Sequence, residues 1–244
     1  KNDFGETRSM ILLKKILFLI FFMMCPLITY AGSGIDQILI PSGEYTLGSL
    51  YCEEEQGNAD WCKDESPRKI KLDSFMIDKY EVSNDNYREC FIAGVCEPSV
   101  LHDDRPNDFN KPLQPVVFVN WKDARAYCVW REGDLPTEAQ WEVAAEGKKL
   151  GGAHFGQPYG NGSPKNIGKF EANSNGLFDM MGNVYEWTRY SSDNSSSAPT
   201  LKNKVVRGGS WSSPSHYLRT SDRVAKDPEL RYSDVGFRCV NIEK

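Results

Sequence analysis

The sequence is poor in histidine. Its 244 residues include three, His102, His154 and His216, and no two of them lie within one helical turn. This spacing excludes the H-E-x-x-H metalloproteases and argues against an iron or zinc site made of histidines alone. The chain also has no CxxC pair, so its cysteines do not have the spacing of a zinc-binding motif.

Basic charge is not in excess either. The formal net charge is −5, which gives no basic surface for nucleic acid, and we expect no nucleic-acid partner. Gly160-Asn161-Gly162 does not follow a strand or open a helix, so it predicts a turn and not a phosphate-binding loop. With 40% hydrophobic and 26% charged residues, the composition is that of an ordinary soluble globular protein.

Only one long hydrophobic run is present, from Ile16 to Ile28. Lys14 and Lys15 precede it and Ala31 follows it, which is the pattern of a secretory signal peptide. The run is shorter than the roughly 20 residues that span a bilayer. We therefore assign residues 1–31 to upstream residues and a signal peptide, and we expect a periplasmic or extracellular protein. The alternative is an uncleaved signal anchor, which would be its only contact with a membrane.

The cysteines agree with export. Cys25 lies in the signal segment, and six cysteines remain, an even number that suggests disulfides in an oxidising compartment. Six cysteines allow fifteen pairings. Short loops favour Cys52–Cys62 and Cys90–Cys96, and these two leave Cys128–Cys239.

Regular elements are predicted mainly before residue 148. Alternation of apolar and polar residues predicts strands at Gly43–Leu50 and Lys69–Val82, and an apolar run predicts another at Val116–Val119. Three helices are predicted by their end signals. They run from the cap Ser83 to Phe91 with a stop at Gly94, from Trp121 to Glu132 with a stop at Gly133, and from the capping box Thr137/Gln140 to Glu146. The remainder is rich in Gly, Asn and Ser and predicts loops.

Five segments, spread over some 200 residues, carry a family resemblance. They are Ile40-Pro41-Ser42-Gly43-Glu44-Tyr45 with Leu47-Gly48; Pro115-Val116-Val117-Phe118-Val119-Asn120-Trp121 with Ala124; Leu135-Pro136-Thr137-Glu138-Ala139-Gln140-Trp141-Glu142; Gly176-Leu177-Phe178-Asp179-Met180-Met181-Gly182-Asn183-Val184-Tyr185-Glu186-Trp187; and Arg207-Gly208-Gly209-Ser210-Trp211, closing with Gly236-Phe237-Arg238-Cys239. In this order they resemble the formylglycine-generating enzyme (sulfatase-modifying factor) domain family.

The resemblance implies an α+β fold, a complex variant of the C-type lectin-like fold with short strands and helices and much irregular structure, as one domain over residues 32–244. It also implies a disulfide between Cys128 and Cys239. Family members bind calcium at the fourth segment. Carried over, this predicts one structural calcium ion held by the side chains of Asp179 and Glu186 and by backbone carbonyls near Gly182 and Val184. The alternative is that Asp179 and Asn183 only form turns.

The sequence departs from the enzymes of the family after Ser210. Formylglycine-generating enzymes carry two cysteines shortly downstream, which together bind copper(I) and activate oxygen. Here Ser212 to Leu218 occupy that stretch, and no cysteine lies between Cys128 and Cys239. Serine hydroxyls are neither copper(I) ligands nor redox-active. We therefore expect no copper and no conversion of cysteine to formylglycine by the known route.

The closing segment is nevertheless dense in side chains that bind ligands. If it lines a surface groove, an extended peptide or a carboxylated small molecule would suit it. The candidate ligand-binding residues are Ser210, Trp211, Ser213, Tyr217, Arg219 and Arg223. The alternative is that Arg219 and Arg223 pair with internal carboxylates such as Asp222, Asp227 or Asp234 and order the loops.

A catalytic role for Glu142, as an acid, is the weaker interpretation of its segment. The structural interpretation is favoured because Thr137 caps a helix there and Trp141 fits a core. The sequence thus predicts an exported ligand-binding or scaffolding domain. The alternative is a periplasmic oxidase or modifying enzyme of the siderophore-maturation type, a family branch that also lacks the copper cysteines.

Overall fold

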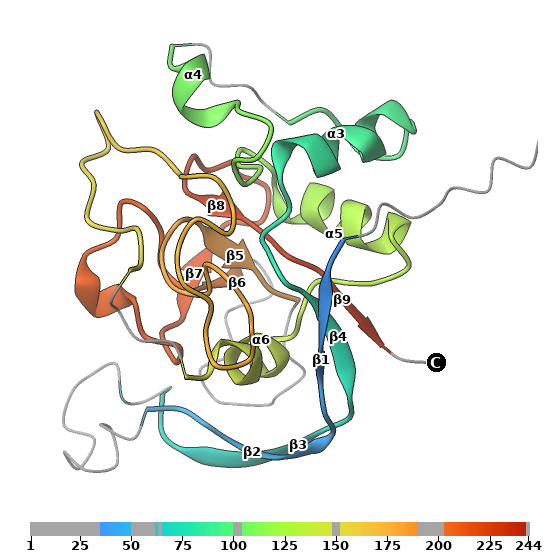
Figure 1. The fold of residues 1–244 in the computed structure, drawn as a ribbon, viewed down its shortest axis with the longest axis vertical. Helices are drawn as coiled ribbons and strands as arrows, with labels where there is room; N and C mark the ends of the chain where they lie inside the picture. Colours follow the sequence, from blue (N-terminus) through green and yellow to red (C-terminus); the bar gives the residue numbers. More distant parts are fainter. Residues whose placement is uncertain are drawn as a thin grey trace, which may run out of the picture. The chain divides into compact units, whose positions relative to one another are not determined.

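The computed structural model describes residues 35–49, 62, 65–99, 104–147, 152–189 and 203–242 (Figure 1). All of them fall in one unit, Ile35–Lys244. Residues 1–31, which carry the predicted signal peptide, lie outside the described residues, so that prediction is not tested. In the described ranges, every helix is too short or too polar to cross a membrane.

Short strands form three separate sheets. They are β1 (Gln37–Ile40), β2 (Gly43–Leu47), β3 (Arg68–Leu72), β4 (Phe75–Asp78), β5 (Tyr185–Trp187), β6 (Lys204–Arg207), β7 (Val224–Lys226), β8 (Val235–Gly236) and β9 (Val240–Ile242). The strand orders are β1-β4-β9, β2-β3 and β7-β6-β5-β8. All pairs are antiparallel except β5 and β8, which are parallel.

The first two sheets share one bent ribbon. Ile40 pairs with Phe75 in the first sheet and Gly43 pairs with Leu72 in the second. The residues between them, 41–42 and 73–74, therefore lie opposite each other where the ribbon turns a corner (Figure 1). The predicted strand Lys69–Val82 is thus two strands, because β3 pairs only with β2 whereas β4 lies between β1 and β9.

The described ranges contain four α-helices, α3 (Asn84–Ile92), α4 (Pro106–Phe109), α5 (Trp121–Trp130) and α6 (Glu138–Ala145). Three of them, α3, α5 and α6, begin where the sequence signals indicate. The Ser83 hydroxyl caps α3, and reciprocal capping boxes open α5 and α6. Helix α4 was not predicted, since four residues give no periodicity.

Helix α5 ends earlier than the predicted Glu132. The left-handed residue is Glu132 itself, with φ of 61°, and not Gly133. Gly133 has another role, because a Cβ atom built there would lie 2.3 Å from the Val240 carbonyl oxygen. The glycine lets the chain after α5 pass directly beside β9.

The predicted strand at Val116–Val119 is wrong. Phe118 has φ of 55°, which interrupts an extended conformation. The backbone amide of Val116 donates to the Val82 carbonyl and that of Phe118 donates to the Tyr232 carbonyl, so the two amides bond to different segments. An apolar run predicts burial, which is correct here, but it does not show whether a neighbouring strand is available for pairing.

The core is cross-linked where the first half of the chain meets its end. Cys128 and Cys239 form a buried disulfide beside Tyr127 and Phe237, which confirms this predicted pair. Cys90 and Cys96 form the second predicted pair. Cys62 is also disulfide-bonded, and Cys52 lies outside the described residues. These disulfides fit an oxidising compartment.

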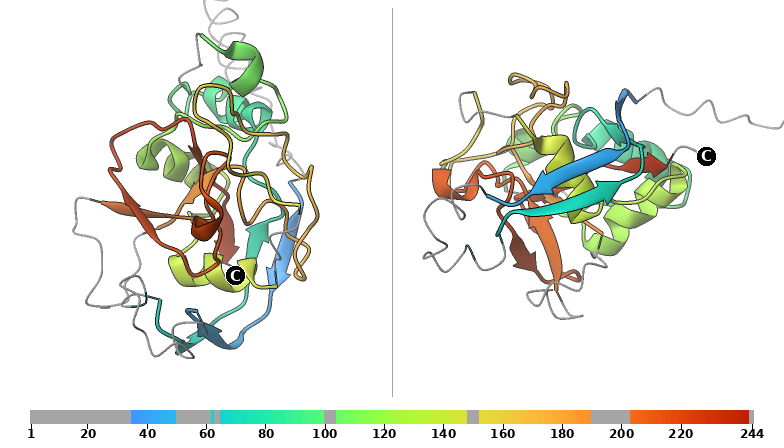
Figure 2. Two further views of the ribbon diagram at one scale, coloured as in Figure 1. Left: turned by 90° about the vertical axis from the view of Figure 1, so that its left-hand side faces the viewer. Right: turned by 90° about the horizontal axis from the view of Figure 1, so that it is seen from below.

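Most of the chain from 152 to 189 has no regular structure. The yellow and orange segments in Figure 2 run as irregular chain with one short strand, β5. The observed mixture of few helices, short strands and long loops confirms the predicted α+β class.

Candidate functional site

A glycine-led turn follows β6. Gly208 and Gly209 have φ of 91° and 75°, a left-handed conformation that side chains disfavour. At Gly208 a Cβ atom would also lie 2.9 Å from the Met180 carbonyl oxygen and from the Trp141 ring. The two glycines therefore let the chain turn sharply against α6 and present the residues that follow them.

Three serine hydroxyls come together on this turn. Ser210 Oγ lies 3.1 Å from both Ser212 Oγ and Ser213 Oγ, and the Ser210 amide donates to Ser213 Oγ over 2.9 Å. Ser210 and Ser213 are buried, and Ser212 is partly exposed. Of these, the hydroxyls of Ser212 and Ser213 lie in the stretch where the resemblance places cysteines.

Asp234 completes the group. Its Oδ2 accepts from Ser210 Oγ at 3.3 Å and from the Tyr159 hydroxyl at 3.1 Å, and Lys226 Nζ lies 3.5 Å from its Oδ1. We call Ser210, Ser212, Ser213, Tyr159, Lys226 and Asp234 the serine–aspartate cluster. The carboxylate is buried and has a cation beside it, as a buried charge requires.

Aromatic rings surround the cation of this cluster. Lys226 Nζ lies 4.3 Å from the centre of the Tyr232 ring and 5.3 Å from that of Tyr185, so both rings contact it by cation–π interaction. Burial raises the pKa of Tyr185 to about 12, so this phenol stays protonated as a hydrogen-bonding group.

The chemistry open to the serine–aspartate cluster is hydrogen bonding. It supplies hydroxyls, phenols and one ion pair, and none of these is a soft ligand for copper(I). In the part of the chain that the structure describes, the hydroxyls of Ser210, Ser212 and Ser213 form no hydrogen bond to a histidine ring. A serine nucleophile of the usual kind takes its proton transfer from such a base. The side chains of the cluster can donate and accept hydrogen bonds.

Trp211 is placed as a structural residue. Its ring is fully buried against Phe109 and Tyr159, and its Nε1 donates to the Ser233 carbonyl. Tyr217 is 38% exposed at the end of a 3₁₀ turn, η2 (Ser215–Tyr217). Of the six predicted ligand-binding side chains, Tyr217 is thus the most open to solvent, and Ser210, Trp211 and Ser213 are buried.

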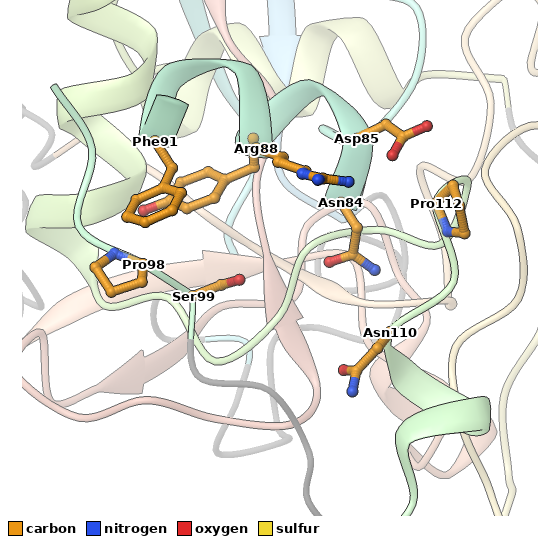
Figure 3. A pocket seen from close by; sticks show the side chains of 9 residues that line it. Asn84, Asp85, Arg88, Phe91, Pro98, Ser99, Asn110 and Pro112 are labelled. Carbon is orange, nitrogen blue, oxygen red and sulfur yellow. The ribbon is translucent and has the colours of Figure 1, made fainter. Parts of the chain in front are cut away.

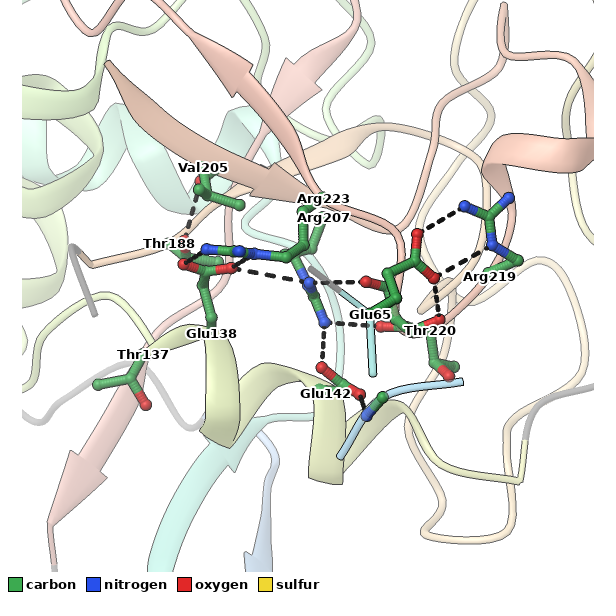
Figure 4. A network of polar contacts seen from close by, with 12 residues as sticks. Glu65, Thr137, Glu138, Glu142, Thr188, Val205, Arg207, Arg219, Thr220 and Arg223 are labelled. Atoms are coloured by element: carbon green, nitrogen blue, oxygen red, sulfur yellow. Dashed lines mark hydrogen bonds and ion pairs between the residues drawn. The ribbon is translucent and has the colours of Figure 1, made fainter. Parts of the chain in front are cut away.

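Arg219 and Arg223 are in internal ion pairs (Figure 4). Arg219 bonds to Glu65 at 2.7 Å and to Asp222 at 2.9 Å, and Arg223 makes two bonds to Glu138. This is the arrangement of the alternative interpretation, in which the arginines order the loops. Asp222 was a predicted partner. Glu65 and Glu138 were not, because they lie far away in the sequence and only the fold brings them near.

Glu142 has a structural partner as well. Its Oε2 lies 2.5 Å from Arg207 Nη2, and its Oε1 accepts from the Gly48 amide at 2.6 Å. Arg207 is fully buried and also donates to the carbonyls of Thr220 and Ser221. Helix α6 therefore holds β6 and the end of β2 through this carboxylate, in agreement with the non-catalytic interpretation of its segment.

The predicted calcium ligands have partners within the protein. Glu186 is fully buried, and both its oxygens bond to Arg238, at 2.8 and 2.7 Å, with a further bond of 2.7 Å from Trp141 Nε1. Asp179 Oδ2 accepts from the Gly168 amide at 2.7 Å. Arg238 also donates to the carbonyls of three other residues, Asp78, Lys79 and Phe178.

In this structure Asp179 and Glu186 bond to groups of the protein itself. A calcium ion at Glu186 would replace the fully buried guanidinium of Arg238, which already supplies the positive charge. The amides of Gly182 and Val184 donate to the Gly208 carbonyl and to Glu81, and these bonds do not involve the carbonyls that the prediction names. Among the described residues, no group of three or more His, Cys, Asp or Glu could hold a metal ion. Calcium binding stays a prediction.

Glu81 is a buried acid that sequence reasoning missed. It accepts from Asn183 Nδ2 at 2.6 Å and from the Val184 amide at 3.3 Å. Burial, together with the charges of Asp179 and Glu186, raises its pKa well above the ordinary value. Glu81 lies within the predicted strand Lys69–Val82, whose alternation of apolar and polar residues gave no sign that this acid would be enclosed.

The fold and the site define a class, an α+β domain whose glycine-led turn carries hydroxyls. The chain belongs to the sulfatase-modifying factor enzyme 1-like domain family, whose model matches residues 29–242. The family resemblance seen in the sequence is thus confirmed.

The chain is also similar to three individual proteins. It is 28% identical to the inactive C-alpha-formylglycine-generating enzyme 2 of Bos taurus, over 86% of this chain and 89% of that protein. The structure of Treponema denticola variable protein 1 matches with a TM-score of 0.66 and 22% identity, covering 84% of this chain and 94% of that one. PvdO from Pseudomonas aeruginosa matches with a TM-score of 0.65 and 22% identity, covering 84% and 93%. The last two likenesses concern the fold.

Proposed function

We propose that this protein is an exported binding domain of its family that does not oxidise cysteine to formylglycine. The observation that carries the proposal is the set of hydrogen-bonded hydroxyls of Ser210, Ser212 and Ser213 in the turn after Gly208 and Gly209. The full-length similarity to a relative named as inactive supports it.

The proposed binding face is the open side of the serine–aspartate cluster. Tyr159 is 64% exposed and Tyr217 is 38% exposed, and Ser212 is the most accessible of the three serines. Hydroxyls and phenols can each donate and accept, so they suit the alternating amides and carbonyls of an extended peptide. A carboxylated small molecule is less well matched, because Arg219 and Arg223 are already paired with carboxylates.

The proposed location of the protein, outside the cytoplasm, is supported by its disulfides and its sequence. Oxidised cysteines at 90, 96, 128 and 239 fit an exported protein, and the basic and apolar pattern of residues 14–31 fits a signal peptide. The periplasm or the cell exterior is therefore part of the proposal.

The first experiment tests for the enzyme activity. The purified protein is incubated with copper(I), oxygen and a cysteine-containing sulfatase peptide, and the peptide is followed by mass spectrometry beside an active formylglycine-generating enzyme. We expect no formylglycine and no copper retained after dialysis. Stoichiometric copper or any turnover above buffer would contradict the proposal. Oxygen consumption with a different substrate would instead favour an oxidase of the siderophore-maturation type.

The second experiment tests for binding. A phage-displayed library of random 12-residue peptides is selected on the wild-type protein and re-tested on Tyr159→Ala and Tyr217→Ala. Leu39→Ala, which removes an exposed side chain from β1, is the matched control. Peptides that lose binding to the two tyrosine variants and keep it on the control support the proposal. Equal binding to all four proteins would reject this face.

A further inference from the structure

A cavity separate from the serine–aspartate cluster lies beside helix α3. It has a volume of about 370 Å³, within the range of small-molecule sites. It is lined by Asn84, Asp85, Tyr87, Arg88, Phe91, Pro98, Ser99, Asn110 and Pro112 (Figure 3). Neither the serine–aspartate cluster nor the buried ion pairs contribute to it.

One end of this α3 cavity is apolar. Phe91 and Pro98 lie there (Figure 3), Tyr87 also lines the cavity one helical turn before Phe91, and Phe91 remains 47% exposed. The Cys90–Cys96 disulfide fixes the chain that leads from α3 to Pro98, and the Tyr87 hydroxyl donates to the Glu97 carbonyl. The wall formed by these rings is therefore held in place before a ligand binds, which lowers the entropy cost of binding.

The polar groups of the cavity are incompletely used. Asn84 donates both amide hydrogens, to the carbonyls of Phe109 and Lys111, which leaves its Oδ1 as an acceptor. Over the described residues, neither Arg88 nor Asp85 nor Ser99 has a side-chain hydrogen bond or ion pair. In Figure 3 Phe91 and Pro98 lie at one end, Asn84 and Asp85 at the other, and Arg88 between them.

This order of groups matches one ligand chemistry. We propose that the α3 cavity binds a small aromatic zwitterion, such as a free aromatic amino acid. The ring packs on Phe91, Tyr87 and Pro98, the carboxylate pairs with Arg88, and the ammonium donates to Asn84 Oδ1 and Asp85. A simple aromatic acid would leave Asp85 facing an anion, and a simple aromatic amine would leave Arg88 facing a cation.

The test uses 4-fluoro-L-phenylalanine as the probe, observed by ¹⁹F NMR on the full chain. We expect saturable line broadening that unlabelled L-phenylalanine displaces. Displacement by 3-phenylpropanoate and by 2-phenylethylamine, which lack the ammonium and the carboxylate, is expected to need about tenfold more competitor. Equal displacement by either analogue would overturn the zwitterion assignment, and no broadening at millimolar probe would overturn the site.

Variants locate the site and assign each charge. Arg88→Gln is expected to weaken probe binding about tenfold, and Asp85→Asn to remove the preference over 3-phenylpropanoate. Phe91→Ala is expected to abolish binding. Glu89→Gln and Ile92→Ala are exposed, lie on the same helix and do not line the cavity, so they serve as controls that bind normally. Wild-type affinity in Arg88→Gln and Phe91→Ala would place the probe elsewhere.

Discussion

The two halves of this domain satisfy their backbone in different ways. In the described residues before 148, helices and paired strands use many of the amides and carbonyls, and local caps such as Ser83 and Thr137 fix the helix starts. In residues 152–242 long irregular segments bond instead to buried side chains, and Arg238 alone serves three carbonyls. Where regular structure is sparse, buried charged side chains form hydrogen bonds to backbone groups that helices and sheets would otherwise pair.

Removing the disulfide that joins the two halves should have the largest effect on the free energy of unfolding. The Cys128–Cys239 disulfide joins residues 111 apart, and closing such a loop contributes about 4–5 kcal/mol to the free energy of unfolding. We expect Cys128→Ala/Cys239→Ala to lose about that amount in urea denaturation. Cys90→Ala/Cys96→Ala, with a separation of 6, should lose about 2 kcal/mol. Equal losses would show that loop length does not control this stabilisation.

Removing one partner of a buried pair tests the second half directly. Arg238→Met leaves Glu186 buried without its cation and removes the hydrogen bonds from Arg238 to the carbonyls of Asp78, Lys79 and Phe178. We expect a loss of about 3–5 kcal/mol by chemical denaturation. Lys122→Met, which breaks the exposed pair with Glu229, is the control and should change stability by less than about 1 kcal/mol. Similar losses for both would refute the distinction between the halves.

The buried acid Glu81 predicts a dependence on pH. Its folded-state pKa is raised by burial, so ionising it costs stability as pH rises above about 4.5, the ordinary value. We expect Glu81→Gln to gain on the wild type with rising pH, by at most about 1.4 kcal/mol per pH unit. Urea denaturation at a series of pH values from 4 to 8 measures this gain. A difference that does not change with pH would mean that Glu81 keeps its ordinary pKa.

The smallest effect is expected from a local cap in the first half. Thr137→Ala removes the hydroxyl that accepts from the Gln140 amide, and it should cost about 1 kcal/mol. Thr137→Ser keeps the hydroxyl and should recover most of that loss. Thermal unfolding of the two variants provides the comparison, and a loss as large as that of Arg238→Met would mean that the helix start also carries long-range structure.

The sequence by itself determined the features that depend on neighbours in the chain. Helix starts at Ser83, Asn120 and Thr137 follow from hydrogen bonds to residues three positions away, so they can be read locally. The short loop between Cys90 and Cys96 likewise favours their disulfide, whereas Cys128–Cys239 was predicted as the remaining pair and by the family resemblance. The family followed from ordered motifs, and with it the α+β class.

Only the tertiary structure decided how distant side chains are paired. Arg223 bonds to Glu138, 85 residues away, and Glu81 is enclosed beside Asn183, 102 residues away. The local pattern around Arg219 and Arg223 allowed either a ligand groove or internal ion pairs, and the fold shows the ion pairs. A charge that leaves water must meet an opposite charge or hydrogen-bond donors, and which ones it meets depends on how the chain packs.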